Sequence, residues 1–154
     1  MGTNRYDVLL VDDDWVQVDL ARRAAAESCP GINLTTLAGG DAALDWFEAG
    51  IKKREQMPHI ILLDLKLPKL DGLAVLRKLR GFPVTGEIPI VVFSAEYTQA
   101  DVLMSYKAGA NSFVAKPFDV AGYAEIFQKG LAYWIHPQQR KPISSGTDGA
   151  AEHI

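Results

Sequence analysis

The segment HIILLDLKLPKLDG, residues 59–72, determines how the rest of the chain is interpreted. It begins with the most apolar short run in the sequence, His59 to Leu63, and this run ends at Asp64. A short run that is apolar on both faces is typical of a central strand in a parallel sheet. Turn residues from Pro68 to Gly72 and an amphipathic pattern from Leu73 to Arg80 follow. The segment therefore predicts a buried strand, a turn and a helix, with a carboxylate where the strand ends.

The same alternation of apolar runs and helical patterns continues in both directions. Four further runs predict strands, at residues 6–11, 32–37, 88–93 and 112–115. Four further patterns predict helices, at residues 14–28 and 41–53, from a Thr98–Asp101 capping box to Ala108, and from the cap Asp119 through Trp134. Strands that alternate with helical crossovers predict an α/β fold with a single doubly wound five-stranded parallel sheet and five helices.

Length and composition fit one globular domain. The chain has 154 residues, of which 48% are hydrophobic and 23% charged, and domains cluster near about 100–150 residues. We expect the domain to span residues 6–135. Residues 136–154 are rich in Gln, Ser, Gly and Pro, and we expect them to form a flexible tail.

Composition also excludes several classes of function. The formal net charge of −3 provides no basic excess for binding nucleic acid. The single cysteine, Cys29, excludes an internal disulfide and a cysteine-based zinc site. The N-terminus does not resemble a signal peptide, and no apolar stretch is long enough for a membrane span. We therefore expect a cytoplasmic protein that binds neither nucleic acid nor membrane.

Polar residues follow four of the predicted strands at the points where they end. These residues are Asp12-Asp13-Asp14, Asp64, Ser94 and Lys116. In open parallel sheets, ligands bind beyond the carboxyl ends of the strands. Helix capping is the simpler explanation and fits Asp14. It does not fit Asp64, because Leu65-Lys66-Leu67-Pro68 follows and not a helix.

The chemistry of this set fits the formation of an aspartyl phosphate. Asp12, Asp13 and Asp64 supply hard oxygen ligands of the kind that Mg²⁺ prefers. An ionised Asp64 can act as a nucleophile toward phosphorus. The negative charge on the three equatorial oxygens of the transferred phosphoryl group must then be neutralised. Mg²⁺, the Lys116 ammonium and the Ser94 hydroxyl can each contact one of these oxygens.

Four segments together resemble the receiver domain of two-component response regulators: VLLVDDD at 8–14, HIILLDLKLPKLDG at 59–72, IPIVVFSA at 88–95 and GANSFVAKPF at 109–118. The resemblance covers about Asp7 to Ile135. It implies a flavodoxin-like sheet of strand order 2-1-3-4-5. It also implies a response regulator that accepts a phosphoryl group on Asp64 from a histidine kinase, with slow self-dephosphorylation and no enzymatic turnover.

The resemblance further implies a metal site for Mg²⁺ or Mn²⁺. Asp13 and Asp64 would bind the ion directly and Asp12 through a metal-bound water. The backbone carbonyl of Lys66 would be a further ligand.

The remaining implied roles concern a switch. Ser94 takes the position of the switch hydroxyl, Lys116 that of the invariant lysine and Phe113 that of the switch aromatic. Pro117 would follow Lys116 in a cis peptide bond. Phosphorylation would draw Ser94 inward and leave a space for Phe113, which would remodel the face built by the fourth helix, the fifth strand and the fifth helix.

Lys66 and Glu96, each two residues beyond a site residue, have opposite charges. Two separately solvated side chains are one interpretation. A Lys66–Glu96 pair across the mouth of the site, which would hinder an attacking water, is the other.

We expect no effector domain after Ile135, and therefore a stand-alone receiver with output through protein contacts. The loop GFPVTGE at 81–87 and the segment AYWIHP at 132–137 resemble the small response regulators of bacterial phytochromes, which implies a phytochrome as the kinase. In that group, dimers through the fifth helix are common. Ile126, Gly130 and Tyr133 lie off the core stripe of this helix, and we expect either ordinary surface residues or a homodimer face there.

Three alternatives stay open. Asp12-Asp13-Asp14-Trp15-Val16 also fits the first motif of haloacid-dehalogenase-like phosphatases, but a later acidic pair at a strand end is missing and Asp64 would have no role. A receiver that only binds partners would not need the complete set of site residues. A receiver that drains phosphoryl groups as a sink in a phosphorelay has the same residues as one that signals forward.

Overall fold

A computed structural model describes residues 6–130 and residue 133, and it confirms the predicted order of strands and helices. The elements are β1 (Tyr6–Val11), α1 (Trp15–Ser28), β2 (Ile32–Leu37), α2 (Gly40–Lys52), β3 (Ile60–Asp64), α3 (Gly72–Gly81), β4 (Ile90–Ser94), α4 (Gln99–Ala108), β5 (Ser112–Ala115) and α5 (Val120–Gly130). Trp134 and the predicted tail at 136–154 lie outside the described residues. Among the described residues, no helix is long and apolar enough to cross a membrane.

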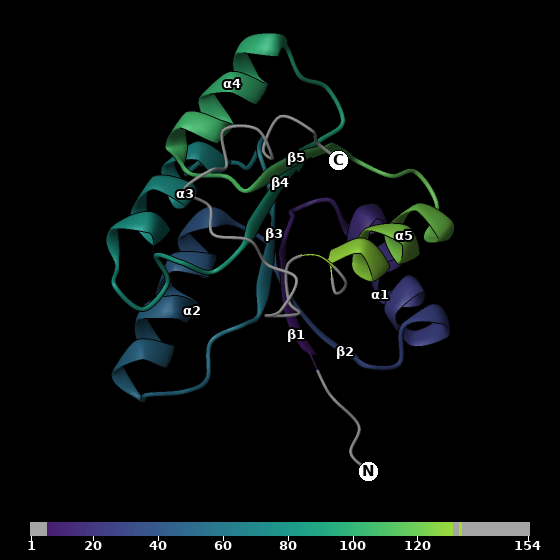
Figure 1. Ribbon diagram of the computed structural model, residues 1–154, viewed down its shortest axis with the longest axis horizontal. Coiled ribbons are helices and arrows are strands. Elements are labelled where there is room, and N and C mark those ends of the chain that lie inside the picture. Colours follow the sequence, from purple (N-terminus) through teal and green to yellow (C-terminus); the bar gives the residue numbers. More distant parts are fainter. Residues whose placement is uncertain (1–5, 131–132, 134–154) are drawn as a thin grey trace.

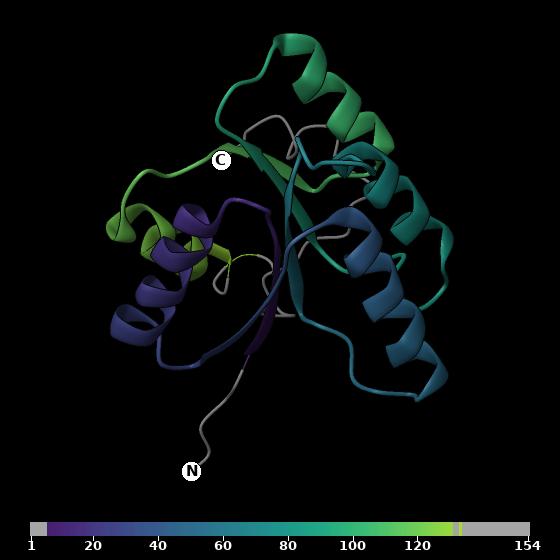
Figure 2. The same cartoon turned by 180° about the vertical axis from the view of Figure 1, so that it is seen from behind.

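All five strands are parallel and lie in the order β2-β1-β3-β4-β5. Helices α1 and α5 cover one face of the sheet, and α2, α3 and α4 cover the other (Figures 1 and 2). Because each face carries helices, successive residues of a strand are buried on opposite sides. In β1, for example, Leu9 and Val11 belong to the core under α2, α3 and α4, whereas Val8 and Leu10 belong to the core under α1 and α5.

Side chains that cap helices fix where three of the helices begin. Asp14 accepts a hydrogen bond from the Val16 amide at 3.0 Å, and Asp71 accepts one from Ala74 at 3.0 Å. Thr98 and Asp101 form the predicted capping box of α4, with bonds of 2.9 and 3.1 Å. Such caps satisfy amide groups that have no partner within the helix. The helix that follows each strand therefore begins directly beyond the carboxyl edge of the sheet.

Gly72 lets the start of α3 pack directly against the end of β3. A Cβ atom at this position would lie 2.3 Å from the Asp64 carbonyl oxygen and 2.8 Å from Leu65 Cα. The Gly72 amide also donates a 3.0 Å hydrogen bond to the Leu65 carbonyl. The start of α3 therefore packs directly against the backbone of Asp64 and Leu65 and restricts its position.

We predict that Gly72→Ala lowers the free energy of unfolding by about 1–3 kcal/mol, because neither backbone segment can yield without strain. Urea unfolding measures this change. Gly81→Ala is the matched control at the other end of α3, where a Cβ would meet nothing within 4 Å. The control should leave stability unchanged or raise it by up to about 1 kcal/mol. Equal effects of the two substitutions would contradict the close packing at Gly72.

Candidate functional site

The five site residues predicted from the strand ends lie at the carboxyl edge of the sheet. Asp12 and Asp13 follow β1, Asp64 ends β3, Ser94 ends β4 and Lys116 follows β5. Strands β1 and β3 are neighbours in the sheet, although α1, β2 and α2 separate them in sequence. This pair is the point at which the chain changes direction across the sheet, where ligands bind in open α/β folds.

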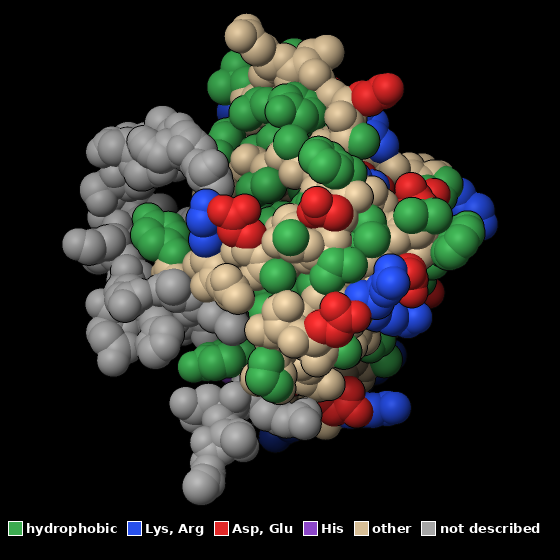
Figure 3. All heavy atoms as spheres, turned by 90° about the vertical axis from the view of Figure 1, so that its right-hand side faces the viewer, with side chains coloured by type: hydrophobic (Ala, Val, Ile, Leu, Met, Phe, Trp, Pro, Cys, Tyr) green, Lys and Arg blue, Asp and Glu red, His purple; other side chains and the backbone are tan. Residues whose placement is uncertain are grey.

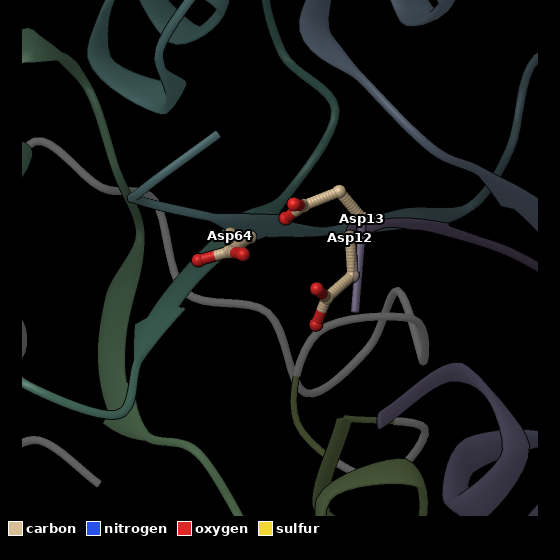
Figure 4. A group of neighbouring side chains, drawn as sticks. All are labelled: Asp12, Asp13 and Asp64. Atoms are coloured by element: carbon tan, nitrogen blue, oxygen red, sulfur yellow. The ribbon is translucent and has the colours of Figure 1, made fainter. Parts of the chain in front are cut away.

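Three carboxylates converge at this edge. One oxygen from each of Asp12, Asp13 and Asp64 lies within 4.8 Å of the others. Figure 4 shows the three side chains grouped around one space at the ends of their strands. Asp12 and Asp64 are almost fully buried, at 1% and 2% exposure, whereas Asp13 is exposed. The site is therefore open to solvent on the side of Asp13.

The ammonium group of Lys116 lies between the two buried carboxylates. Its Nζ atom is 3.1 Å from Asp64 Oδ2 and 3.1 Å from Asp12 Oδ2. The bond to Asp64 has hydrogen-bond geometry, and the Phe93 ring centroid lies 5.4 Å from the same nitrogen. Lys116 thus offsets part of the negative charge of the two buried carboxylates.

Burial and charge change the acidity of both partners. Burial and then the charge of Asp12 raise the pKa of Asp64 to about 6, although Lys116 acts in the opposite direction. Burial opposes the charged form of Lys116, but Asp12 and Asp64 outweigh it and raise the pKa of the amine. Asp64 is therefore ionised at neutral pH, but its ionised form is less stable than it would be in water.

The donor atoms at this site fit a divalent metal ion. Asp12 Oδ1 accepts a hydrogen bond from the Asp14 amide at 2.9 Å. Asp12 Oδ2 is buried and has no hydrogen-bond donor, although Lys116 lies at ion-pair distance. A carboxylate oxygen in this state, beside two further carboxylates, matches the hard oxygen ligands of Mg²⁺ or Mn²⁺.

Ser94 and Phe113 both lie inside the protein. The Ser94 hydroxyl donates to the Glu96 carbonyl oxygen at 2.9 Å. Phe113 is 8% exposed and belongs to the core under α2, α3 and α4. The Tyr97 ring, from the loop between β4 and α4, meets it edge-on at 4.9 Å. The aromatic position that the resemblance associates with a switch is therefore already buried in this structure.

The peptide bond between Lys116 and Pro117 is trans, which corrects the cis bond implied by the resemblance. The trans isomer is the intrinsically favoured one, by about 0.5–1 kcal/mol for a bond before proline.

Of the two interpretations of Lys66 and Glu96, the one in which they pair across the mouth of the site is wrong, because the ion pair of Lys66 is with Asp101. Lys66 Nζ lies 3.6 Å from Asp101 Oδ2, in the first turn of α4. The Thr98 amide first, and also the Lys66 ammonium, lower the pKa of Asp101. Asp101 competes better for Lys66 because the capping box holds its carboxylate in place, whereas Glu96 lies in the loop before the helix.

The expected homodimer face stays a prediction. Ile126 is half-buried and packs against the core under α1 and α5. Gly130 is the last residue of α5, and Tyr133 is 47% exposed.

Comparison with known proteins decides the family. Residues 8–128 match the response regulator receiver domain. The response regulator Rcp1 of Synechocystis sp. is 30% identical over 129 residues, which cover 83% of this chain and 88% of the relative. The chain belongs to the response regulator receiver domain family.

Solved structures of relatives show the same fold as this receiver domain. A manganese-bound crystal structure of Rcp1 aligns with a TM-score of 0.72 at 29% identity, over 85% of this chain and 95% of the other. The phosphorylated cyanobacterial phytochrome response regulator RcpA gives 0.75 at 28% identity, over 86% and 96%. The bacteriophytochrome response regulator RtBRR gives 0.69 at 30% identity, over 92% and 87%.

We predict that the metal-free receiver becomes less stable as pH rises from about 4 to above 6. The folded state binds a proton on Asp64 up to about pH 6, whereas the unfolded chain releases it near 3.9. The stability due to this proton is complete below the unfolded pKa and is lost as pH rises through the folded one. Asp64→Asn should lack this loss, so its advantage over wild type should grow by about 2 kcal/mol across the interval.

Urea unfolding in EDTA at several pH values measures this difference, since the other titrating groups are common to both proteins. Addition of Mg²⁺ should stabilise wild type far more than Asp64→Asn at neutral pH. An advantage of Asp64→Asn that stays constant from pH 4 to 7 would contradict the raised pKa.

Proposed function

We propose that this protein is a response regulator that accepts a phosphoryl group on Asp64 from the phosphohistidine of a histidine kinase. The observation that carries the proposal is the pairing of the buried Asp64 carboxylate with the Lys116 ammonium at 3.1 Å, beside Asp12 and Asp13. Membership of the receiver family supports it, because receiver domains are phosphoacceptors and not enzymes with turnover.

The transfer needs one nucleophile and one leaving group. A carboxylate oxygen of Asp64 attacks phosphorus, so an oxygen–phosphorus bond forms while the nitrogen–phosphorus bond of the phosphohistidine breaks. The electron pair of the broken bond stays on the imidazole nitrogen, which takes a proton from solvent. The backbone amide of Lys66 donates to Asp64 Oδ1 at 3.0 Å and orients the carboxylate for this attack.

Asp12, Asp13 and Asp64 would hold a divalent metal ion, together with the Lys66 carbonyl. When bound, the ion supplies positive charge to the phosphoryl oxygens. The Lys116 ammonium neutralises a second oxygen from its place between Asp12 and Asp64. For a third, the Ser94 hydroxyl would exchange its present acceptor, the Glu96 carbonyl, for a phosphoryl oxygen. This exchange gives the loop between β4 and α4 a direct response to phosphorylation.

The kinase that we propose is a bacterial phytochrome. Similarity to RcpA and RtBRR, which are phytochrome response regulators, supports this choice. We also propose a homodimer through α5, as the resemblance of the sequence to the small phytochrome response regulators implies. Two outputs are compatible with this proposal, a forward signal to a partner protein and a sink for phosphoryl groups in a phosphorelay. The direction of net phosphoryl transfer distinguishes them.

A phosphatase of the haloacid-dehalogenase type is less well supported. In such an enzyme the nucleophile would lie in the segment 12–14. The first and third acidic residues of that segment already have other contacts. Asp12 forms an ion pair with Lys116, and the Asp14 side chain caps α1. The strand order and the family match also leave Asp64 as the acceptor supported by the geometry.

Acetyl phosphate with Mg²⁺ should add one phosphoryl group to wild type and none to Asp64→Asn, because the amide is not a nucleophile toward phosphorus. Intact-protein mass spectrometry measures the added group. Asp71→Asn is a matched control, since Asp71 is an exposed carboxylate that caps α3 and is not one of the three clustered carboxylates. Label retained by Asp64→Asn, or steady turnover of p-nitrophenyl phosphate, would contradict the assignment.

Transfer from a kinase tests the proposed partner. Among purified autophosphorylated histidine kinases, a bacterial phytochrome should label wild type within seconds to minutes, at least about tenfold faster than unrelated kinases. Lys116→Met should slow transfer, because it removes the charge beside Asp64. Equal rates from all kinases would remove the support for a phytochrome and leave the phosphoacceptor role intact.

A further inference from the structure

Lys116 reaches its two carboxylates across a neighbouring strand. Its backbone follows β5, and its amide donates to the Ser94 carbonyl, at the end of β4, at 3.0 Å. Asp64 ends β3 and Asp12 follows β1, and both of these strands lie beyond β4 in the sheet. Adjacent strands are about 4.8 Å apart, so the Lys116 side chain must extend past β4 to reach the carboxylates. The side chains of β4 along this path therefore influence where the ammonium group lies.

Phe93 is the residue of β4 that Lys116 contacts on this path. It pairs with Val114 of β5, two residues before Lys116, and both side chains pack in the core under α1 and α5. The Lys116 Nζ atom lies over the Phe93 ring, 5.4 Å from its centroid. Phe93 is 1% exposed and the lysine side chain 9%, so little water competes for the ammonium group. A cation over an aromatic face within about 6 Å is attracted by the ring, and more strongly where water is excluded.

A second aromatic residue holds the Phe93 ring in its orientation. The Tyr123 ring of α5 meets it edge-on, with centroids 6.3 Å apart and planes at 89°. Tyr123 is fully buried, and its hydroxyl donates to Gln17 Oε1 in α1. Figure 3 faces the side of the molecule where Figure 1 places α1 and α5, and charged, polar and hydrophobic side chains are mixed on its surface. The two rings are buried beneath these helices, and contacts from β4, α5 and α1 fix them together.

The ring differs from the carboxylates in its response to a new charge at the site. An ammonium group carries three N–H bonds, so contacts with Asp12 and Asp64 leave room for a third. A divalent ion held by the carboxylates would compete with Lys116 for their oxygens, and a phosphoryl group on Asp64 would give the ammonium a new partner. The Phe93 ring carries no formal charge, so its attraction for Lys116 would persist through both changes.

We propose that Phe93 is a positioning residue for Lys116, and that the face of its ring keeps the ammonium group beside Asp64 and within reach of the incoming phosphoryl oxygens. This inference rests on the function proposed for Asp64. Lys116 acts on the phosphoryl group, whereas Phe93 acts through Lys116. The positioning role requires the negative face of the ring. A residue that only filled space in the core would require the shape of the ring and not its charge distribution.

Fluorinated phenylalanines at position 93 of the full-length protein separate these two roles. Each added fluorine withdraws negative charge from the ring face and changes the shape of the ring little. Phosphorylation by acetyl phosphate with Mg²⁺, followed by intact-protein mass spectrometry, should slow in step with the number of fluorines. A trifluorinated ring should lower the rate about threefold to tenfold. The same series at Phe47, which is fully buried in the other core, is the matched control and should leave the rate unchanged.

The contact itself can be followed without metal or phosphorylation. In EDTA, exchange of the Lys116 ammonium hydrogens with water, observed by NMR at low temperature, reports how firmly the ammonium group is held. With a trifluorinated ring at position 93, this exchange should be about twofold to fivefold faster than in wild type. The trifluorinated ring at Phe47 should leave the exchange rate of Lys116 unchanged.

A phosphorylation rate that does not depend on the number of fluorines at position 93 would overturn the proposal. Equal effects of the series at Phe47 would also overturn it, because they would indicate a general effect of fluorine on the core. Failure of the function proposed for Asp64 is distinguishable from both results, since it would show as an absence of phosphoryl label in wild type. The exchange measurement in EDTA would then still decide whether the Phe93 ring holds Lys116.

Discussion

The contact of one ammonium group with two buried carboxylates governs the rest of this structure. Asp12 and Asp64 lie at the ends of adjacent strands, where mutual repulsion and loss of water both oppose their charge. Lys116 approaches both within 3.1 Å and makes this arrangement tolerable. With Asp13, the group still has an excess of two negative charges over positive ones. The folded domain therefore keeps an excess of negative charge at one edge of the sheet, which a bound divalent ion would offset.

The parallel sheet makes such a group possible. Residues far apart in sequence arrive together because all the strands point the same way, so that every strand end lies at one edge. The two apolar cores hold the strands from both faces, and Gly72 allows α3 to press against the end of β3. The burial of Asp12 and Asp64 thus comes from the same packing that stabilises the fold.

Much of this was predictable from the sequence because it depends on local pattern. Apolar runs of about five residues that end in Asp64 or Ser94 indicate both a strand and the side chain at its end. The capping box of Thr98 and Asp101 likewise indicates where a helix begins. The partner of Lys66 was not predictable in this way. A long side chain reaches several carboxylates, and the choice of Asp101 over Glu96 depends on how the α4 cap orients its first turn in space.

The role of Arg80 was missed for a similar reason. In the sequence Arg80, in the last turn of α3, is one more basic residue of an amphipathic helix. Most of its hydrogen bonds go to backbone carbonyls, which no residue type indicates, and one goes to Asn111 Oδ1. A capped glycine at 109 and the nearby Asn111 were the available signals. These bonds become visible only once the fold brings the segment before β4 and the turn before β5 within reach of Arg80.

The two edges of the sheet consequently differ in how they respond to charge. At the edge that carries the carboxylates, ionic contacts among Asp12, Asp64 and Lys116 dominate. At the opposite edge, the contacts include hydrogen bonds to uncharged groups, such as the bond from Arg80 Nη1 to the Ile88 carbonyl at 2.8 Å and the bond from the Asp7 amide to His59 Nδ1 at 3.0 Å. A phosphoryl group on Asp64 would add negative charge to the first of these edges, where Lys116 and the Ser94 hydroxyl are the side chains placed to answer it.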